Sequence, residues 1–145
     1  MRALLQRVSR AAVSVEGQEI ARIGPGLVVL LGVGHGDGEA QVRQMADKVL
    51  NLRIFADAQG KFNLSALDVG ADVLVVSQFT LYADTRKGRR PSFVDAAPPD
   101  VAAPLVDNFA ELVRRAGLRV GTGQFGAHML VEILNDGPVT IWLEV

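Results

Sequence analysis

The stretch Asn135-Asp136-Gly137-Pro138-Val139-Thr140 interrupts the last apolar part of the chain. We expect it to determine how the last strands of the sheet are arranged. Apolar residues alternate with other residues on both sides of it: Val131, Ile133, Ile141 and Leu143. Such alternation is typical of strands with one buried face. We therefore predict two strands, Met129 to Leu134 and Val139 to Val145, with the stretch as the bend between them.

Gly137 and Pro138 give this bend unusual backbone chemistry. Glycine reaches positive φ without a Cβ clash, and proline has a fixed φ and no amide proton. A Gly-Pro bond also has an accessible cis state, which about 5–6% of X-Pro bonds adopt in folded proteins. In the cis state the carbonyls on either side can point the same way and form a rigid acceptor surface without side chains. The alternative is an ordinary trans-proline turn, which that base rate favours.

The composition is that of one globular domain, residues 1–145. With 49% hydrophobic residues and a mean hydropathy of +0.24, the chain is apolar enough to bury a core and is not disordered. Charged residues make up 21%, slightly below the average of about 25%, which fits a protein with surface hidden in an oligomer. The chain has no cysteine, which excludes a thiol nucleophile, a disulfide framework and a cysteine-based zinc site.

The expected location is the cytoplasm, with no membrane partner. No apolar run approaches the roughly 18 residues needed to span a bilayer, and polar residues interrupt Met1 to Arg7 too early for a signal peptide. The net charge of −1 and the pI of about 6.1 argue against a globally basic nucleic-acid binder. We expect no DNA partner, and any RNA contact must come from a local patch.

The order of the expected elements predicts an α+β fold. Apolar residues at helical spacing indicate two helices, one from Glu39 to Leu52 with Asp37 as its N-cap and one from about Asp100 to Ala116. The apolar face of the second helix is Val101, Leu105, Phe109, Leu112 and Val113. The other expected strands are Ala3 to Val15, a hairpin return through Ile20 and Ile23, Leu27 to Val33, Arg53 to Phe55 and Asp72 to Leu81. We predict mainly antiparallel sheets forming a barrel-like core, with the two helices covering one side.

Polar side chains end the expected strand Asp72 to Leu81, within the motif Ser77-Gln78-Phe79-Thr80-Leu81. A buried strand tolerates hydroxyls that reach a carbonyl. The alternative is a site at the end of the strand, where hydroxyls, a carboxamide and backbone amides converge on a ligand. The two histidines, His35 and His128, lie in no triad signature, so a serine hydrolase is disfavoured.

Neither a dinucleotide site nor a metal site is indicated. In the loop Gly34 to Gly38 the last glycine comes too early for a dinucleotide fingerprint, and the chain lacks a βαβ frame. Asp37 and Glu39 beside His35 form only a weak cluster, more typical of a solvated loop and a helix cap. We predict no metal and no cofactor.

Two loops carry candidate binding residues. Four cations are concentrated in one loop of a slightly acidic chain: Arg86, Lys87, Arg89 and Arg90. Such a run is usually a solvated loop, but it is also the place to hold a polyphosphate, with Phe93 as an anchor. In the glycine-rich loop 121–127, Phe125 stands between small residues, where its ring either stacks on a base or plugs the core.

Together, the motifs Ser77 to Leu81 and Asn135 to Thr140 resemble the two signature motifs of the D-aminoacyl-tRNA deacylases. The likeness extends over the full chain: the opening Leu5-Gln6-Arg7-Val8, the strand end Gly32-Val33, the loop Arg86 to Phe93 and the ending at Trp142. Two separate motifs in the right order and spacing make the match specific.

The resemblance implies a small cytosolic homodimer that cleaves the ester between a D-amino acid and tRNA, with the active site at or near the subunit interface. It implies that Gly137-Pro138 is cis and enters the partner subunit's pocket, where main-chain carbonyls hold the substrate α-ammonium and leave no room for an L side chain. A glycyl ester, which has no side chain, is not excluded by that route.

The resemblance also assigns roles to residues of this sequence. The implied catalytic residues, which surround the terminal adenosine and support the ester, are Thr80, Ser77 and Gln78. The implied substrate-binding residues are Gly137, Pro138, Phe125, Phe79 and Arg7, of which Arg7 supports the Gly-Pro element. The implied tRNA-binding residues are Arg86, Lys87, Arg89 and Arg90.

The neighbouring hydroxyl on the ribose of such an ester can assist attack by water, so the protein needs only to position the ester and to place amide donors near the oxyanion. Thr80 as a covalent nucleophile is the weaker option. Two rival hypotheses remain. One is a related deacylase with a trans Gly-Pro that accepts a small L-residue, which Arg7 and the Ser77 to Leu81 pattern disfavour. The other is a non-catalytic tRNA-binding dimer domain that uses the cations from Arg86 to Arg90.

Overall fold

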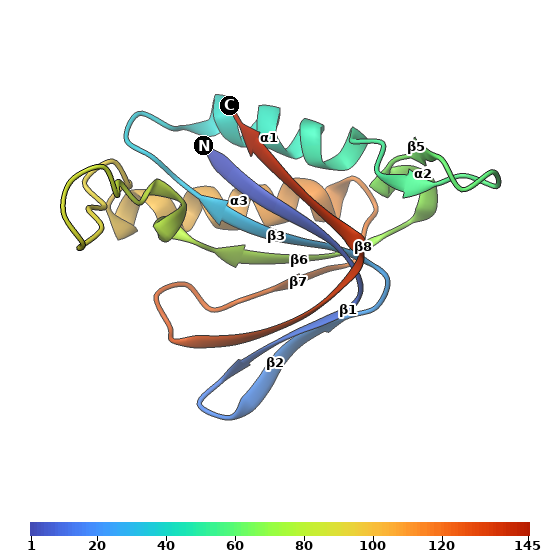
Figure 1. Ribbon diagram of the computed structural model, residues 1–145, viewed down its shortest axis with the longest axis horizontal. Coiled ribbons are helices and arrows are strands. Elements are labelled where there is room, and N and C mark those ends of the chain that lie inside the picture. The colour runs from blue at the N-terminus through green and yellow to red at the C-terminus, as the bar shows by residue number, and fades with distance from the viewer.

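The computed structural model describes residues 1–145 and shows a mixed sheet with helices on one side (Figure 1). The strands of this sheet are β1 (Arg2–Val15), β2 (Gln18–Ile23), β3 (Gly26–Gly32), β6 (Asp72–Ser77), β7 (Val120–Thr122) and β8 (Met129–Glu144). A separate two-stranded sheet consists of β4 (Phe55–Ala56) and β5 (Phe62–Leu64). The helices are α1 (Glu39–Asn51), α2 (Ala66–Val69) and α3 (Pro99–Arg115), and the 3₁₀ helix η1 spans Phe79–Tyr82.

Strand β1 organises the sheet because it pairs along both of its edges. Along one edge it runs antiparallel to β3 over residues 2–8 and then to β2 over residues 11–15. Along the other edge it runs antiparallel to β8 from residue 2 to residue 15. Since β1 changes neighbours halfway, the sheet folds over, and Figure 1 shows β2 and the first half of β8 curling beneath β6 and β7. The predicted α+β fold with a barrel-like core is confirmed, although the pairs β3–β6 and β6–β7 are parallel. Helix α1 lies in the connection from β3 to β6 and helix α3 in that from β6 to β7, so the expectation that the chain lacks a βαβ frame was wrong.

Strand β3 separates two apolar cores, because successive side chains of a strand point to opposite faces. Leu27 and Leu31 face the larger core, to which α1 and α3 contribute. Val28 faces the smaller core inside the curled sheet, together with Val8 and Ile23. A strand that is apolar throughout is therefore buried on both faces, as predicted for Leu27 to Val33.

Helices α1 and α3 cover the same face of the sheet, and their apolar stripes were largely predicted. Helix α3 buries Leu105, Phe109 and Val113. The prediction for Val101 was wrong: its side chain is 42% exposed, because the buried stripe of α3 begins one residue later, at Ala102. None of the helices is long and apolar enough to cross a membrane.

The predicted cap of α1 was also wrong. Gly38 is the N-cap residue, and its backbone N–H donates to the side chain of Gln41. The carboxylate of Asp37 instead accepts hydrogen bonds from the backbone nitrogens of Met1 (2.6 Å) and Gly34 (2.7 Å). Asp37 thus joins the start of β1 to the loop after β3, a long-range role that local sequence does not reveal.

The two strands expected at the end of the chain are one strand, β8. Both halves of β8 pair with β1, so the stretch from Asn135 to Thr140 does not reverse the chain, and the prediction of a bend between two strands was wrong. The pairing passes from Gln6↔Thr140 to Val8↔Asn135, which leaves residues 136–139 opposite Arg7 alone, as a bulge. Alternating apolar residues are compatible with a hairpin and with a bulged strand, so the sequence pattern could not separate the two.

Two further boundaries differ from the prediction. The strand expected from Asp72 to Leu81 ends at Ser77, where the chain turns into η1. The strand expected from Arg53 to Phe55 is β4, displaced to Phe55–Ala56. Its partner β5 and the helix α2 were not predicted. In Figure 1, β5 and α2 lie at the opposite end of the molecule from the loop that follows η1.

Candidate active site

A cavity of about 380 Å³ opens where β3 and β6 end. This volume lies at the lower end of the range of small-molecule sites, about 300–1,000 Å³. Its wall combines the strand ends with η1, the start of α3 and the loop before β8, and among its residues are Leu31, Ser77, Gln78, Phe79, Phe93 and Phe125. The carboxyl ends of adjacent parallel strands meet at this edge of the sheet, where ligands commonly bind.

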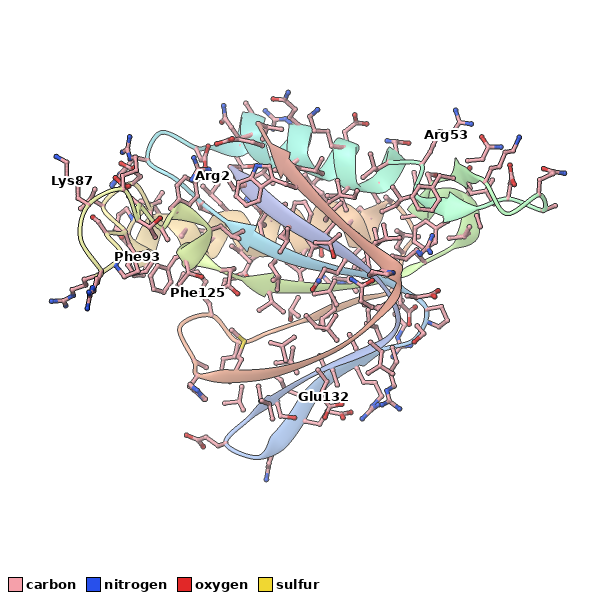
Figure 2. The ribbon with its side chains drawn as sticks, viewed as in Figure 1. Arg2, Arg53, Lys87, Phe93, Phe125 and Glu132 are labelled. Carbon is pink, nitrogen blue, oxygen red and sulfur yellow. The ribbon has the colours of Figure 1, made fainter.

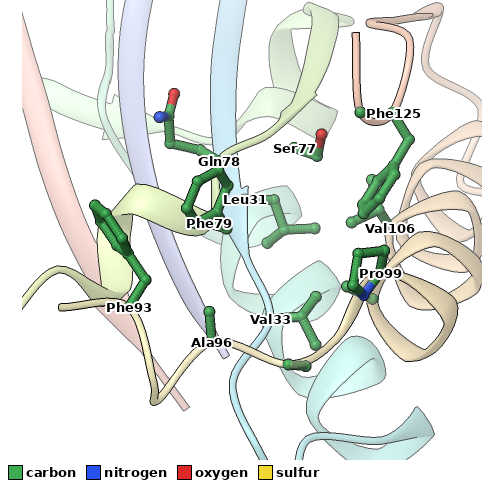
Figure 3. A pocket seen from close by; sticks show the side chains of 13 residues that line it. Leu31, Val33, Ser77, Gln78, Phe79, Phe93, Ala96, Pro99, Val106 and Phe125 are labelled. Carbon is green, nitrogen blue, oxygen red and sulfur yellow. The ribbon is translucent and has the colours of Figure 1, made fainter.

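Aromatic rings stand on two sides of the cavity. Figure 3 shows Phe125 with Pro99 and Val106 on one side, Phe79 and Phe93 on the other, and Leu31 and Val33 between them. The rings of Phe79 and Phe93 pack edge to face, with centroids 5.0 Å apart. Since Phe125 is 38% exposed, it lines the cavity and does not plug the core.

Ser77 and Gln78 supply the polar part of the cavity wall. Both side chains are half-buried, and the backbone N–H of Gln78 donates to the Leu31 carbonyl at 2.8 Å, which fixes the end of β6 against β3. The carboxamide of Gln78 donates to the hydroxyl of Thr80. Thr80 itself is exposed on η1 and lies outside the wall, so the structure brings Ser77 and Gln78 into the cavity but leaves Thr80 beside it.

Contacts far apart in the sequence hold η1 in place. The guanidinium of Arg2 donates to the Leu81 carbonyl at 3.1 Å and lies 4.4 Å from the ring centroid of Tyr82. The Tyr82 hydroxyl donates to Asp37, and burial, with the nearby Asp37 carboxylate, raises the pKa of Tyr82. A Cβ at Gly34 would lie 2.6 Å from the Tyr82 ring, so the loop passes close over it. These supporting residues carried no signal in the sequence, because each acts through a distant segment.

Neither histidine completes a nucleophile–base pair. His128 lines a shallow neighbouring cavity of about 280 Å³ that also includes Ser77 and Gln78, which sequence reasoning did not anticipate. Its side chain is exposed and makes no hydrogen bond with Ser77. The structure contains no group of three or more acidic or histidine side chains suited to a metal ion.

The bulge in β8 presents backbone at its surface. The Gly137–Pro138 peptide bond is cis, and both residues are exposed. The side chain of Asn135 closes the bulge: its oxygen accepts from the Val139 N–H at 2.7 Å, and its nitrogen donates to the Val139 carbonyl at 3.2 Å. Gly137 has a φ of +143°, a conformation that residues with a Cβ rarely adopt.

Arg7 lies against this bulge. Its Nε donates to the Asp136 carbonyl at 2.9 Å, and its Nη1 donates to the Ile54 carbonyl at 2.7 Å. Its Nη2 lies 3.2 Å from the position that a Cβ on Gly137 would occupy. Arg7 therefore joins β1, the segment before β4 and the bulge of β8.

Within one chain, the bulge and the cavity lie apart. Arg7 is level with Leu27 and Val73 in the sheet, whereas Ser77 is level with Leu31. Four residues separate these levels, which at about 3.3 Å per residue is roughly 13 Å along the strands. Gly137, Pro138 and Arg7 are absent from the cavity wall. One chain therefore does not bring all the predicted site residues together.

The four predicted tRNA-binding cations lie on the loop between η1 and α3. Arg86 pairs with Asp84 at 2.7 Å, and this guanidinium holds the pKa of the Asp84 carboxyl well below its usual range. Lys87, Arg89 and Arg90 are exposed and form no ion pair. Backbone hydrogen bonds between Asp84 and Ser92 close the base of the loop. Figure 2 shows Lys87 at the outer side of the loop and Phe93 on the side of the loop toward Phe125, and Phe93 and Phe125 both line the cavity.

Fold and cavity define a small α+β protein with an aromatic-walled site at the end of a parallel strand pair and a separate glycine–proline bulge. A family model described as D-Tyr-tRNA(Tyr) deacylase matches residues 4–144. The chain belongs to this family, as its two sequence motifs indicated.

Individual relatives are similar in sequence to this chain over at least 99% of its length. The D-aminoacyl-tRNA deacylase of Roseiflexus castenholzii is 63% identical over 144 residues, covering 99% of this chain and 92% of the relative. That of Heliobacterium modesticaldum is 64% identical over 144 residues, covering 99% and 96%. A solved structure titled "c-Myc DNA Unwinding Element Binding Protein" is 44% identical, covers 100% of this chain and 99% of its own, and superimposes with a TM-score of 0.93.

Proposed function

We propose that this chain is a D-aminoacyl-tRNA deacylase, a hydrolase that cleaves the ester between a D-amino acid and the terminal ribose of tRNA. The main observation in support of this proposal is the aromatic-walled cavity with Ser77 and Gln78 at its edge, in a chain of the D-Tyr-tRNA(Tyr) deacylase family. Names of relatives with more than 60% identity support the same reaction.

The terminal adenosine is the part of the substrate that best fits the cavity. Its base is flat and apolar on both faces, and stacking of a base on an aromatic side chain contributes about 1–3 kcal/mol. Phe125 offers one face, and the Phe79–Phe93 pair offers an aromatic edge on the other side. Ser77 and Gln78 then lie within the polar rim, where they hydrogen-bond the ribose or the ester carbonyl.

In the proposed reaction, water adds to the ester carbonyl, the bond between the carbonyl carbon and the ribose oxygen breaks, and that oxygen takes up a proton. The neighbouring ribose hydroxyl assists the water, so the chain needs no catalytic base, which accords with the absence of a hydrogen bond between His128 and Ser77. The protein contributes the orientation of the ester and donors for the oxyanion, effects that contribute several kcal/mol in comparable sites. Thr80, held by Gln78, is a positioning residue in this scheme.

Selection between mirror-image substrates requires a second subunit. The bulge at Gly137 and Pro138 is exposed and lies far from the cavity of its own chain. In the proposed homodimer it enters the cavity of the partner subunit, where main-chain carbonyls accept the substrate α-ammonium. The close backbone leaves no space for an L side chain, whereas a D side chain points away. A glycyl ester passes this filter because it has no side chain.

Exposed cations on the loop between η1 and α3 bind the phosphates of the tRNA. Lys87, Arg89 and Arg90 are free for this purpose, whereas Arg86 is partly neutralised by Asp84. Because the chain carries a net charge of −1, tRNA binding depends on this local patch.

Initial rates on one tRNA charged with D-Tyr, L-Tyr, Gly or L-Ala test the proposal. We expect fast release of D-Tyr, measurable release of Gly and release of L-Tyr that exceeds the uncatalysed rate only at high protein concentration. Preference for L-Ala would favour the related deacylase for small L-residues. Binding of charged tRNA without hydrolysis would favour the non-catalytic domain.

A further inference from the structure

The β4–β5 hairpin and the residue directly before it each contact Arg7. The carbonyl of Ile54, directly before β4, accepts from Arg7 Nη1 at 2.7 Å. The ring centroid of Phe62, the first residue of β5, lies 5.3 Å from the guanidinium carbon of Arg7. Arg7 in turn donates to the Asp136 carbonyl at 2.9 Å. A chain of contacts thus runs from the hairpin through Arg7 to the bulge that contains Gly137.

Phe62 has no packing role that accounts for its position. Its side chain is 56% exposed, and it belongs to neither of the two apolar cores. The hydrogen bonds of the Arg7 side chain both go to main-chain carbonyls, so the Phe62 ring is the one side chain that offers this guanidinium an attractive surface. A cation over an aromatic face within about 6 Å is attracted by the negative face of the ring.

We propose that Phe62 is a positioning residue for stereochemical selection. Its ring holds the Arg7 guanidinium in the orientation in which Nε reaches the Asp136 carbonyl and Nη2 lies against Gly137. The backbone at Gly137 is then fixed where a small displacement would alter the space left for a substrate side chain. This inference rests on the proposed function of the Gly137–Pro138 bulge, and it adds a residue outside both sequence motifs to that function.

Replacement of the ring tests this role. Phe62→Leu keeps an apolar side chain but removes the aromatic face, whereas Phe62→Tyr keeps the face. Ile20→Ala is the matched control, because Ile20 is also a large exposed apolar residue (44%) but lies on β2, away from Arg7. Rates on D-Tyr-tRNA and L-Tyr-tRNA are measured for each variant and for the wild type, together with the melting temperature and the dimer fraction.

A cation–aromatic contact at an exposed site corresponds to about a two- to fivefold change in an equilibrium constant. We therefore expect Phe62→Leu to lower the ratio of D to L rates by about that factor, with Phe62→Tyr and Ile20→Ala close to wild type. An unchanged ratio in Phe62→Leu would overturn the proposal. A fall in melting temperature or in dimer fraction with an unchanged ratio would also overturn it, because Phe62 would then be a structural or interface residue.

An NMR measurement separates this inference from the proposed function. The guanidinium carbon of Arg7 lies 5.3 Å from the Phe62 ring centroid, so the chemical shift of the adjacent Nε–H proton is expected to change in Phe62→Leu and to change little in Phe62→Tyr. If the wild type does not discriminate between D-Tyr and L-Tyr, the proposed function fails, whatever the Arg7 signal does. If the wild type discriminates and the Arg7 signal is the same in all variants, the positioning role of Phe62 fails alone.

Discussion

Gly137→Ala is the substitution for which the structure gives the most definite expectation. A Cβ on Gly137 would lie 2.7 Å from Cγ2 of Val139 and 3.2 Å from Nη2 of Arg7. The φ of +143° is also unfavourable for alanine. Strain of this kind costs about 1–3 kcal/mol where the surroundings hold the residue in place. Because Val139 is buried and Arg7 is held by two carbonyls, the bulge must move to relieve the clash.

This displacement is expected to weaken the contact of the bulge with the substrate in the transition state. A loss of about 1.4–2.7 kcal/mol of transition-state stabilisation corresponds to a fall of about ten- to a hundredfold in kcat/KM. We expect a fall in this range for D-Tyr-tRNA in Gly137→Ala, measured as initial rates of D-Tyr release. The free energy of unfolding, from urea titration, should fall by at most about 3 kcal/mol.

Gly17→Ala is the matched control, because Gly17 also has a positive φ (+78°) but nothing lies within 4 Å of a Cβ at that position. We expect this variant to lose stability through backbone strain and to keep wild-type turnover. If Gly137→Ala keeps wild-type kcat/KM on D-Tyr-tRNA, the bulge is not the element that contacts the substrate, and the account of selection is wrong.

Three further variants test other parts of the site. Thr80→Ala should keep measurable turnover, because Thr80 lies outside the cavity wall; an acyl-Thr80 adduct detected by mass spectrometry would show instead that it is a nucleophile. Arg2→Met removes an ion pair with Glu144 and, in addition, the hydrogen bond to Leu81 and the contact with Tyr82. Urea unfolding should therefore show a loss of about 1 kcal/mol, and kcat/KM should fall. Arg22→Met removes only an exposed ion pair and should change neither quantity, so equal effects of the two variants would refute a role for Arg2 in holding η1. Replacing Lys87, Arg89 and Arg90 together by alanine should raise KM for charged tRNA. It should also make the slope of log(kcat/KM) against log salt less steep, by about 0.7–0.9 per lost phosphate contact. The control Arg115→Ala, on α3, should leave this slope unchanged. An unchanged slope in the triple variant would place the tRNA elsewhere.

The sequence predicted the fold class because its signals were local. Leu27 to Val33 is apolar throughout and is buried on both faces, and the stripe of Leu105, Phe109 and Val113 identified α3. The motif Ser77 to Leu81 likewise led to the cavity, since Ser77, Gln78 and Phe79 line it.

The errors arose where distant residues decide the local structure. Strand β6 ends at Ser77 because η1 is fixed by Arg2, from the start of the chain, and no pattern within residues 72–81 contains that information. Alternation around Asn135 to Thr140 could not show that both flanking segments pair with β1. Phe62 lies in a short segment without periodicity, and its contact with Arg7 is visible only in three dimensions.

If each active site combines the cavity of one subunit with the bulge of the other, mixed dimers of two variants give a stringent test. One chain carries Gln78→Ala and Phe125→Ala, which remove the carboxamide and the stacking face of the cavity; the other carries Gly137→Ala. Co-expression with two different affinity tags, followed by two purification steps, isolates the mixed dimer. If the bulge of each subunit serves the cavity of the other, the mixed dimer contains one fully wild-type site and one doubly defective site.

The rate of D-Tyr release from D-Tyr-tRNA by this mixed dimer, compared with each parent variant and with the wild type, is the most direct test of the account. We predict about half of the wild-type rate per dimer, although both parent dimers are nearly inactive. A mixed dimer no more active than its parents would mean that cavity and bulge act within the same chain, and a protein that forms no dimer at all would contradict the account equally.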